Sequence, residues 1–172
     1  MALPAIASLA LLLAVARAPE DAPKVDKTAP RPVPTSAVTL DAIDRILADP
    51  KVDAMRSEYP LIVDFAQRSD QVEIVIGEPF FAFSGQKPLD AALLAYYLAG
   101  AVKFDLTHRE LVSDPRADVP DAIRAALVFY RKYHAAHPET SHPLFERFDK
   151  LDREGGLEAF VRDAQTPPAS PR

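Results

Sequence analysis

An uncharged, apolar run over residues 91–102, AALLAYYLAGAV, limits the possible folds more than any other segment. Its only polar side-chain groups are the hydroxyls of Tyr96 and Tyr97, and Pro88 just before it is typical of the first turn of a helix. A helix that is apolar on all its faces belongs in the centre of a domain. The run is shorter than the roughly 20 residues of a transmembrane helix, so it predicts a buried central helix. Gly100 predicts a close crossing with a neighbouring helix.

Helical spacing of apolar residues also occurs before and after this run. Thr39 is the expected N-cap of a first helix, and apolar residues at helical spacing continue from position 40 to position 65. Within that stretch, Pro60 either kinks a helix or begins a new one. Pro120 and Pro143 each begin a later helix, and a final short helix follows the Gly-Gly pair at 155 and 156.

Residues 71–84, QVEIVIGEPFFAFS, have a different pattern. Apolar and polar residues alternate at first, and Gly77 and Pro79 then interrupt the alternation, which predicts a β-hairpin or an extended loop lying on the helices. A short helix over 72–76 is the open alternative. The sequence therefore predicts a mainly α protein, a single compact helical domain of about five to seven helices, with a small hairpin or loop near 71–84.

The first 18 residues have the pattern of a signal peptide. An apolar run from Ala5 to Val15 is followed by Ala16-Arg17-Ala18, the small-x-small pattern that signal peptidase accepts. The run is too short for a membrane anchor, so we expect it to be cleaved. We expect the mature chain to be exported, periplasmic or extracellular, without an integral membrane span. The expected boundaries are a signal peptide at 1–18, a Pro-rich flexible linker at 19–37, the helical domain at 38–164 and a disordered tail at 165–172.

The composition and the motifs argue against several functional classes. The chain contains no cysteine, which removes disulfides, thiolate metal ligands and cysteine nucleophiles. It has 20 Lys and Arg residues against 25 Asp and Glu residues, with the two signs interspersed, so nucleic acid is not expected as a partner. No phosphate-binding or nucleotide-binding glycine motif and no G-x-S-x-G motif occurs. We therefore expect no cofactor, and an enzyme is not the favoured interpretation.

Three histidines lie close together in the segment HAAHPETSH, at positions 134, 137 and 142. Imidazoles and carboxylates bind zinc and related ions, so His134, His137, Glu139 and His142 form a candidate metal site. They define an alternative hypothesis, in which the chain is a periplasmic or secreted hydrolase or a metal-binding protein, with His108 recruited by the fold. The competing structural interpretation is that these histidines interact with the ends of two helices.

Phe80, Phe81 and Phe83 form the candidate binding site. Strand alternation cannot bury the consecutive rings of Phe80 and Phe81 on one face, so we expect an exposed aromatic patch that binds a protein or peptide partner. The structural alternative is that neighbouring helices cover the rings, as is usual for phenylalanine. The leading functional hypothesis is a non-catalytic, exported binding or protein-interaction module, and the oligomeric state is left open.

Overall fold

The computed structural model describes residues 32–114 and 116–165. All regular elements in these ranges are helices, and the prediction of a mainly α domain is confirmed. The signal peptide expected at 1–18, most of the expected linker and most of the expected tail lie outside the described residues. The elements are α1 (Ser36–Ala48), α2 (Ala54–Ser57), α3 (Tyr59–Arg68), α4 (Lys87–Thr107), the 3₁₀ helix η1 (Arg109–Leu111), α5 (Val119–Ala136), α6 (Pro143–Arg153) and α7 (Leu157–Gln165).

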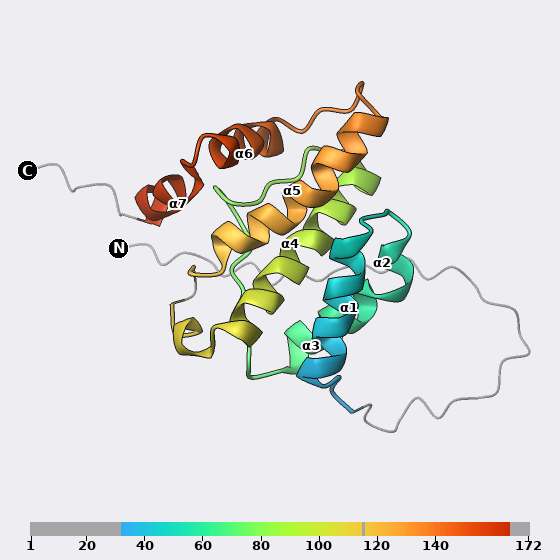
Figure 1. Ribbon diagram of the computed structural model, residues 1–172, viewed down its shortest axis with the longest axis vertical. Helices are drawn as coiled ribbons and strands as arrows, with labels where there is room; N and C mark the ends of the chain where they lie inside the picture. The colour runs from blue at the N-terminus through green and yellow to red at the C-terminus, as the bar shows by residue number, and fades with distance from the viewer. Residues whose placement is uncertain (1–31, 115, 166–172) are drawn as a thin grey trace, which may run out of the picture. The chain divides into compact units, whose positions relative to one another are not determined.

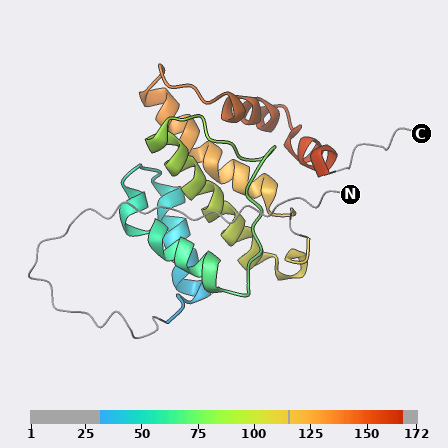
Figure 2. The same cartoon turned by 180° about the vertical axis from the view of Figure 1, so that it is seen from behind.

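Helices α4 and α5 form an antiparallel pair through the middle of the domain (Figures 1 and 2). Gly100 on α4 lies against Ala125 on α5, and earlier on α4 the ring of Tyr96 stacks on that of Phe129 at 4.8 Å between centroids. The close crossing predicted from Gly100 is confirmed. Because no other side chain is as small, glycine at this position lets the two backbones approach each other.

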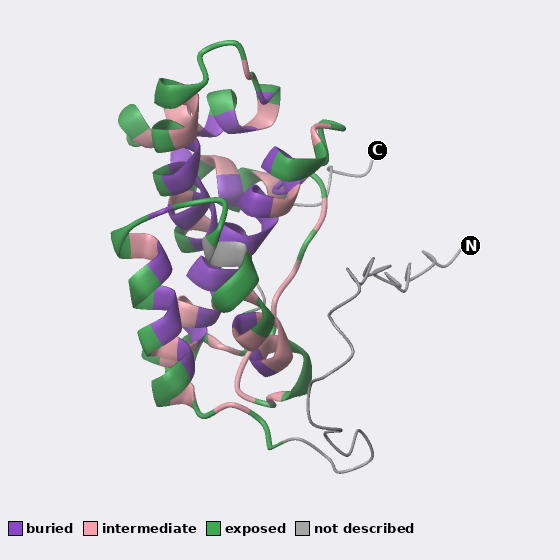
Figure 3. Cartoon of the chain, turned by 90° about the vertical axis from the view of Figure 1, so that its right-hand side faces the viewer, coloured by how far each residue is buried: buried purple, intermediate pink, exposed green. Residues whose placement is uncertain are grey.

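Helix α4 is the central helix that the apolar run predicts. Its residues from Ala92 to Val102 are all buried, and Figure 3 shows the buried residues gathered along the inner faces of the helices. Both buried tyrosines have hydrogen-bond partners for their hydroxyls. The hydroxyl of Tyr96 accepts from the amide of Lys51 at 2.8 Å, and that of Tyr97 donates to the carbonyl of Val75 at 3.2 Å.

The remaining helices cover the two sides of the central pair. Helices α1 and α3 pack on α4, while α6 and α7 pack on α5 (Figure 1). Ion pairs join the elements at their rims: Arg131 of α5 donates to Asp149 and Asp152 of α6 at 2.6 and 2.7 Å. Among the helices of the described residues, none has both the length and the hydropathy needed to cross a bilayer.

The helix ends agree with the sequence in most places. Helices α3, α4, α5 and α6 each have proline in the first turn, so Pro60 begins a new helix. The expected N-cap at Thr39 is wrong, because α1 begins one turn earlier. The hydroxyl of Thr35 caps the amide of Val38, whereas Thr39 is fully buried and donates to the carbonyl of Thr35 at 3.0 Å.

The glycine pair after α6 stops the helix as expected. Gly155 has a φ of +69°, which is unfavourable for residues with a side chain. Its amide donates to the carbonyl of Asp152, and the amide of Gly156 donates to that of Leu151 at 2.8 Å. These two bonds form a Schellman motif, which satisfies free carbonyls at the end of α6 and turns the chain into α7.

The segment 71–84 is an extended loop and contains no strand. The extended loop was one of the three structures expected here, and neither the β-hairpin nor the short helix over 72–76 is formed. The loop is held to α4 by side chains, since the amide of Glu73 donates to Asp105 at 3.0 Å and that of Ser84 donates to Asp90 at 3.0 Å. Buried carboxylates therefore accept hydrogen bonds from backbone amides of the loop, as the carbonyls of a neighbouring strand would in a sheet.

Candidate functional site

Two of the three candidate phenylalanines are buried in the core. Phe80 and Phe81 are 2% and 3% exposed, whereas Phe83 is 60% exposed. The amides of Phe80 and Phe81 both donate to the carbonyl of Gly77 at 2.9 Å, and this turn directs both rings inward. Phe80 packs edge-on against Phe160 of α7, and Phe81 packs against rings of α4 and α6. The premise that consecutive rings stay exposed is wrong because the segment is a turn and not a strand. Only Phe83 still offers its ring to a partner.

The four residues of the predicted metal site do not converge. His134 donates from Nδ1 to the carbonyl of Thr140 at 2.7 Å, and His137 and Glu139 are exposed, with Nδ1 and Oε1 3.6 Å apart. His142 is buried at 2% exposure. Within residues 32–114 and 116–165, no three His, Asp or Glu side chains are placed to hold a metal ion. The structure thus does not bring the four candidate ligands together: His134 lies in the last turn of α5, His137 at its C-cap and His142 at the N-cap of α6.

The buried His142 lies beside Asp90 and Ser84. Asp90, in the first turn of α4, accepts from the hydroxyl of Ser84 at 2.7 Å and from the amide of Gly85 at 2.9 Å. Nε2 of His142 is 3.4 Å from the same carboxylate. The carboxylate therefore lies between the serine and the histidine, so the imidazole is not placed to take the hydroxyl proton as a nucleophile requires. This arrangement holds the loop on the start of α4 and does not activate the serine.

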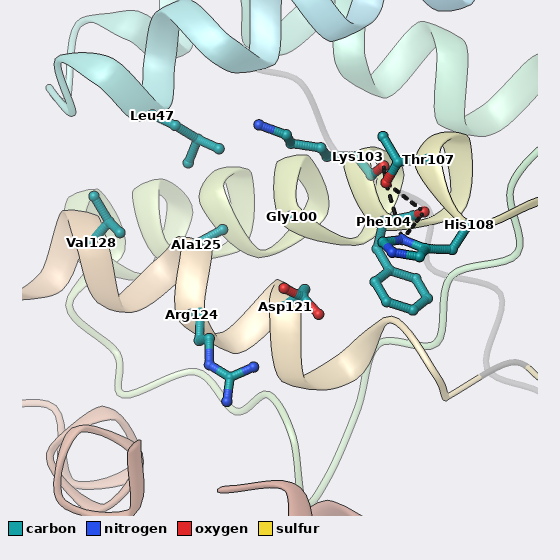
Figure 4. Close-up of a pocket in the computed structure, with 10 residues that line it drawn as sticks. All are labelled: Leu47, Gly100, Lys103, Phe104, Thr107, His108, Asp121, Arg124, Ala125 and Val128. Atoms are coloured by element: carbon teal, nitrogen blue, oxygen red, sulfur yellow. Dashed lines mark hydrogen bonds between the residues drawn. The ribbon is translucent and has the colours of Figure 1, made fainter. Parts of the chain in front are cut away.

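A groove of about 320 Å³ runs along the crossing of α4 and α5, beside α1. Gly100 lies at its centre, and Leu47, Ala125 and Val128 form an apolar part of its lining (Figure 4). Val128 is 42% exposed although it is a large aliphatic residue. The volume is at the lower end of the range for ligand sites, roughly 300 to 1,000 Å³, which suits a few side chains better than a large cofactor.

Both cations that line the groove are paired with carboxylates outside it. Nζ of Lys103 lies 2.6 Å from Asp44 of α1. Arg124 lies 3.1 Å from Asp152 of α6 and also forms an ion pair with Glu158 of α7. In Figure 4 the side chain of Arg124 accordingly points away from α4. The charges of Lys103 and Arg124 are therefore largely balanced before any ligand arrives.

Asp121 is the exception among the charged groups of the groove. It is exposed in the first turn of α5, and its carboxylate lies beside Gly100 in Figure 4. Within the described part of the chain, this carboxylate makes neither a hydrogen bond nor an ion pair. Asp121 therefore gives one wall of the groove a negative charge that is in no contact ion pair, although Arg124 of the same helix attracts it.

His108 also lines the groove, at the C-terminal end of α4, whereas His134 and His137 lie at the C-terminal end of the antiparallel α5. Its ring stacks on that of Phe104 at 4.3 Å between centroids, and Nδ1 is 3.1 Å from the hydroxyl of Thr107. That hydroxyl donates to the carbonyl of Lys103 at 2.8 Å, as threonines at helix ends commonly do. Because the hydroxyl of Thr107 donates its proton to a backbone carbonyl and not to a base, Thr107 is not an activated nucleophile.

Two further carboxylates, Asp105 and Asp118, are buried near the extended loop at 3% and 1% exposure. Asp105 accepts from the amide of Glu73, but neither oxygen of Asp118 has a hydrogen-bond partner. Burial raises the pKa of Asp118 to about 7, and the charge of Asp105 adds to this effect. Burial likewise raises the pKa of Asp105. The two carboxylates make the stability of this region depend on pH.

Sequence reasoning did not identify the groove. Its lining comes from three helices, and the contribution of Leu47, Asp121 and Val128 depends on how α1, α4 and α5 pack. Gly100 was the stronger of two signals, because a close helix crossing fixes which residues of the partner helix lie opposite it. Val128 gave a weaker signal, since it lies off the apolar stripe of α5 and has no place in the core.

No known protein family, no curated protein and no solved structure matches this chain. The functional argument therefore rests on the geometry and charges of the groove.

Proposed function

We propose that the chain is an exported, non-catalytic binding module that docks a short peptide segment of a partner protein in the groove between α1, α4 and α5. The observation that carries the proposal is the exposed aliphatic side chain of Val128, which lines this groove together with Leu47 and Ala125. An aliphatic side chain that is exposed in a concave site gains most from being covered by a ligand.

The rigidity of the groove supports a binding role. Its floor lies on the close crossing where Gly100 meets α5, and a floor of this kind loses little conformational entropy when a ligand binds. A peptide is favoured over a large cofactor by the modest volume, and aliphatic side chains of a peptide match the apolar lining.

A binding role without catalysis is supported by the chemistry of the lining. The one hydroxyl there, that of Thr107, donates to a carbonyl of its own helix. The histidines of the HAAHPETSH segment do not come together at the groove, which His108 alone reaches. No side chain of the groove thus has the nucleophile and base arrangement that covalent catalysis uses.

The proposal that the module acts outside the cytoplasm is supported by the pattern of residues 1–18. The Pro-rich residues 19–37 suit a spacer in front of the domain, because proline favours extended conformations. A partner is then expected in the same exported compartment.

The test is a selection of random twelve-residue peptides, displayed on phage, against the purified full chain. Enriched peptides are resynthesised, and their affinities are measured for the wild type, for Val128→Glu and for Val38→Glu. Val38 is the matched control because it is a valine on a helix, is 48% exposed and lies outside the groove. Circular dichroism and thermal unfolding establish that both variants fold.

We expect peptides that bind the wild type and Val38→Glu equally and lose at least about tenfold in affinity for Val128→Glu. Enriched peptides that bind all three proteins equally would show that another surface binds. A selection that enriches no peptide with a dissociation constant below about 1 mM would overturn the proposal.

A further inference from the structure

We infer that the groove selects a segment in which a positively charged residue lies next to a small aliphatic residue, and that Asp121 sets this preference. The inference rests on the proposed function and names the chemistry of the partner.

The charges around the groove favour a cation. Lys103 is paired with Asp44, and Arg124 is paired with two carboxylates of α6 and α7. Lys103 and Arg124 therefore have little free charge to offer an anionic ligand. An anionic ligand would have to displace an existing ion pair. A cationic ligand meets the exposed carboxylate of Asp121, which forms no ion pair among the described residues and is attracted by Arg124 without contact.

Asp121 also lies in the right place for such a contact. It is exposed, and its backbone carbonyl lies so close to Gly100 that a Cβ on Gly100 would come within 2.6 Å of it. The missing side chain at Gly100 therefore lets the first turn of α5, which carries Asp121, pack close to α4 at the groove. A Lys or Arg side chain entering from solvent can lay its aliphatic stem along Ala125 and Val128 and place its charge at Asp121.

Helix α5 gives a competing structural explanation for Asp121. An acidic residue in the first turn interacts favourably with the helix dipole and needs no ligand to account for it. The two explanations differ in their consequences, because loss of a dipole interaction lowers the stability and leaves peptide selection unchanged. A ligand contact changes affinity and its dependence on salt.

The net charge of the whole chain works in the same direction. The formal charge is −5 at pH 7, so the field of the protein attracts a basic segment and speeds its association. This long-range effect is spread over many residues, whereas the contact at Asp121 is local. Neutralising a carboxylate far from the groove changes the net charge but not the contact at Asp121, and so distinguishes the long-range effect from the local one.

The experiment uses two random peptide libraries, one with lysine and one with glutamate fixed at the central position. Both are selected against the full chain, and the enriched peptides are then measured on Asp121→Asn, Asp163→Asn and Val128→Glu. Asp163 is the matched control, since it is an exposed aspartate on α7 that lies outside the groove. Affinities are measured at about 50 and 500 mM NaCl, where screening differs strongly.

We expect binders from the lysine library alone, with a loss of about fivefold to tenfold on Asp121→Asn and little change on Asp163→Asn. High salt should weaken binding to the wild type more than to Asp121→Asn. Binders that are lost on Val128→Glu but are indifferent to Asp121→Asn, or that come equally from both libraries, would overturn the charge preference and leave the groove intact. Binders that are indifferent to Val128→Glu would instead contradict the proposed function.

Discussion

Gly100 of α4 and Ala125 of α5 face each other where the two central helices cross in close contact. A Cβ added to Gly100 would lie 2.6 Å from the Cβ of Ala125, and 2.8 Å from the Cα of Ala122. Real Cβ atoms do not approach other atoms so closely, so the crossing requires glycine. The same crossing forms the floor of the groove, and the fold and the candidate site therefore depend on one pair of small residues.

Gly100→Ala should destabilise the domain. Alanine gains about 1 kcal/mol over glycine in helix propensity. This gain is outweighed because the new methyl group forces α4 and α5 apart, and overpacking of this kind costs roughly 1 to 3 kcal/mol. We expect a net loss in the free energy of unfolding, measured by urea denaturation.

The double variant Gly100→Ala with Ala125→Gly is the control for this prediction. Ala125→Gly alone loses about 1 kcal/mol of helix propensity, but it also removes one of the clashes, so the losses of the two single variants should be less than additive in the double variant. A single variant Gly100→Ala that is more stable than the wild type would show that the helices are not in close contact here.

Phe81→Ala and Phe83→Ala should differ sharply in their effects on stability. Phe81 is 3% exposed and packs edge-on against Tyr97 of α4 at 5.6 Å between ring centroids, so its removal leaves a cavity that costs about 3 to 5 kcal/mol. Phe83 is 60% exposed, and its removal should cost less than about 1 kcal/mol. Chemical denaturation measures both. Equal losses for the two variants would mean that the loop 71–84 packs differently.

The contribution of Asp118 to the free energy of unfolding should fall as pH rises. Burial raises its pKa from 3.8 to about 7 in the folded state. Below pH 3.8 the carboxyl is protonated in both states, and its contribution to stability is fully present. Between pH 3.8 and about 7 it ionises in the unfolded chain alone, so folding becomes less favourable by at most about 1.4 kcal/mol per pH unit. Above about pH 7 the folded state also ionises, and this contribution levels off.

Asp118→Asn tests this assignment, since asparagine is neutral at every pH in the window. The free energy of unfolding of the variant, relative to the wild type, should increase from pH 4 to pH 7 and then stay constant. Urea denaturation at pH steps of about 0.5 resolves such a slope. If the two proteins give parallel profiles, Asp118 does not titrate as its burial beside Asp105 requires.

Processing of the first 18 residues tests the export part of the proposal. We expect a chain that is expressed in a bacterial host with an export machinery to be recovered outside the cytoplasm with Pro19 as its first residue, as mass spectrometry of the intact protein shows. Replacing Ala16 and Ala18 by arginine should block cleavage, because signal peptidase requires small residues there. Recovery of the wild-type chain from the cytoplasm with Met1 still present contradicts the proposed compartment.

Much of the fold could be predicted from local signals. Prolines at 60, 88, 120 and 143 lie in the first turns of helices because only there does the missing amide cost nothing. The run 91–102 had to be central, since no surface helix is uncharged on all faces. The start of α1 was less predictable, because Thr35 and Thr39 are chemically equal caps and only the burial of Thr39 distinguishes them.

The candidate site could not be predicted in the same way, because it depends on contacts between distant elements. Phe80 and Phe81 are adjacent in sequence, yet a turn at Gly77 places one against α7 and the other against α4 and α6. The histidines are close in sequence but separate in the fold, because His134 and His137 lie at the end of α5 and His142 is the N-cap of α6. The groove needs Leu47 of α1 beside residues of α4 and α5, and no spacing in the sequence encodes that neighbourhood.

The most direct test of the central claim is a map of amide chemical shifts. A lysine-containing peptide from the selection is titrated into the ¹⁵N-labelled full chain, and the shifts are followed by NMR. We expect the largest changes at residues 100–108 and 121–128, which lie on the two helices that form the groove, with Val38 and Asp163 unchanged. Changes centred on Phe83 or on another face, with the amides of Asp121 and Val128 unmoved, would contradict the claim that this groove binds the partner.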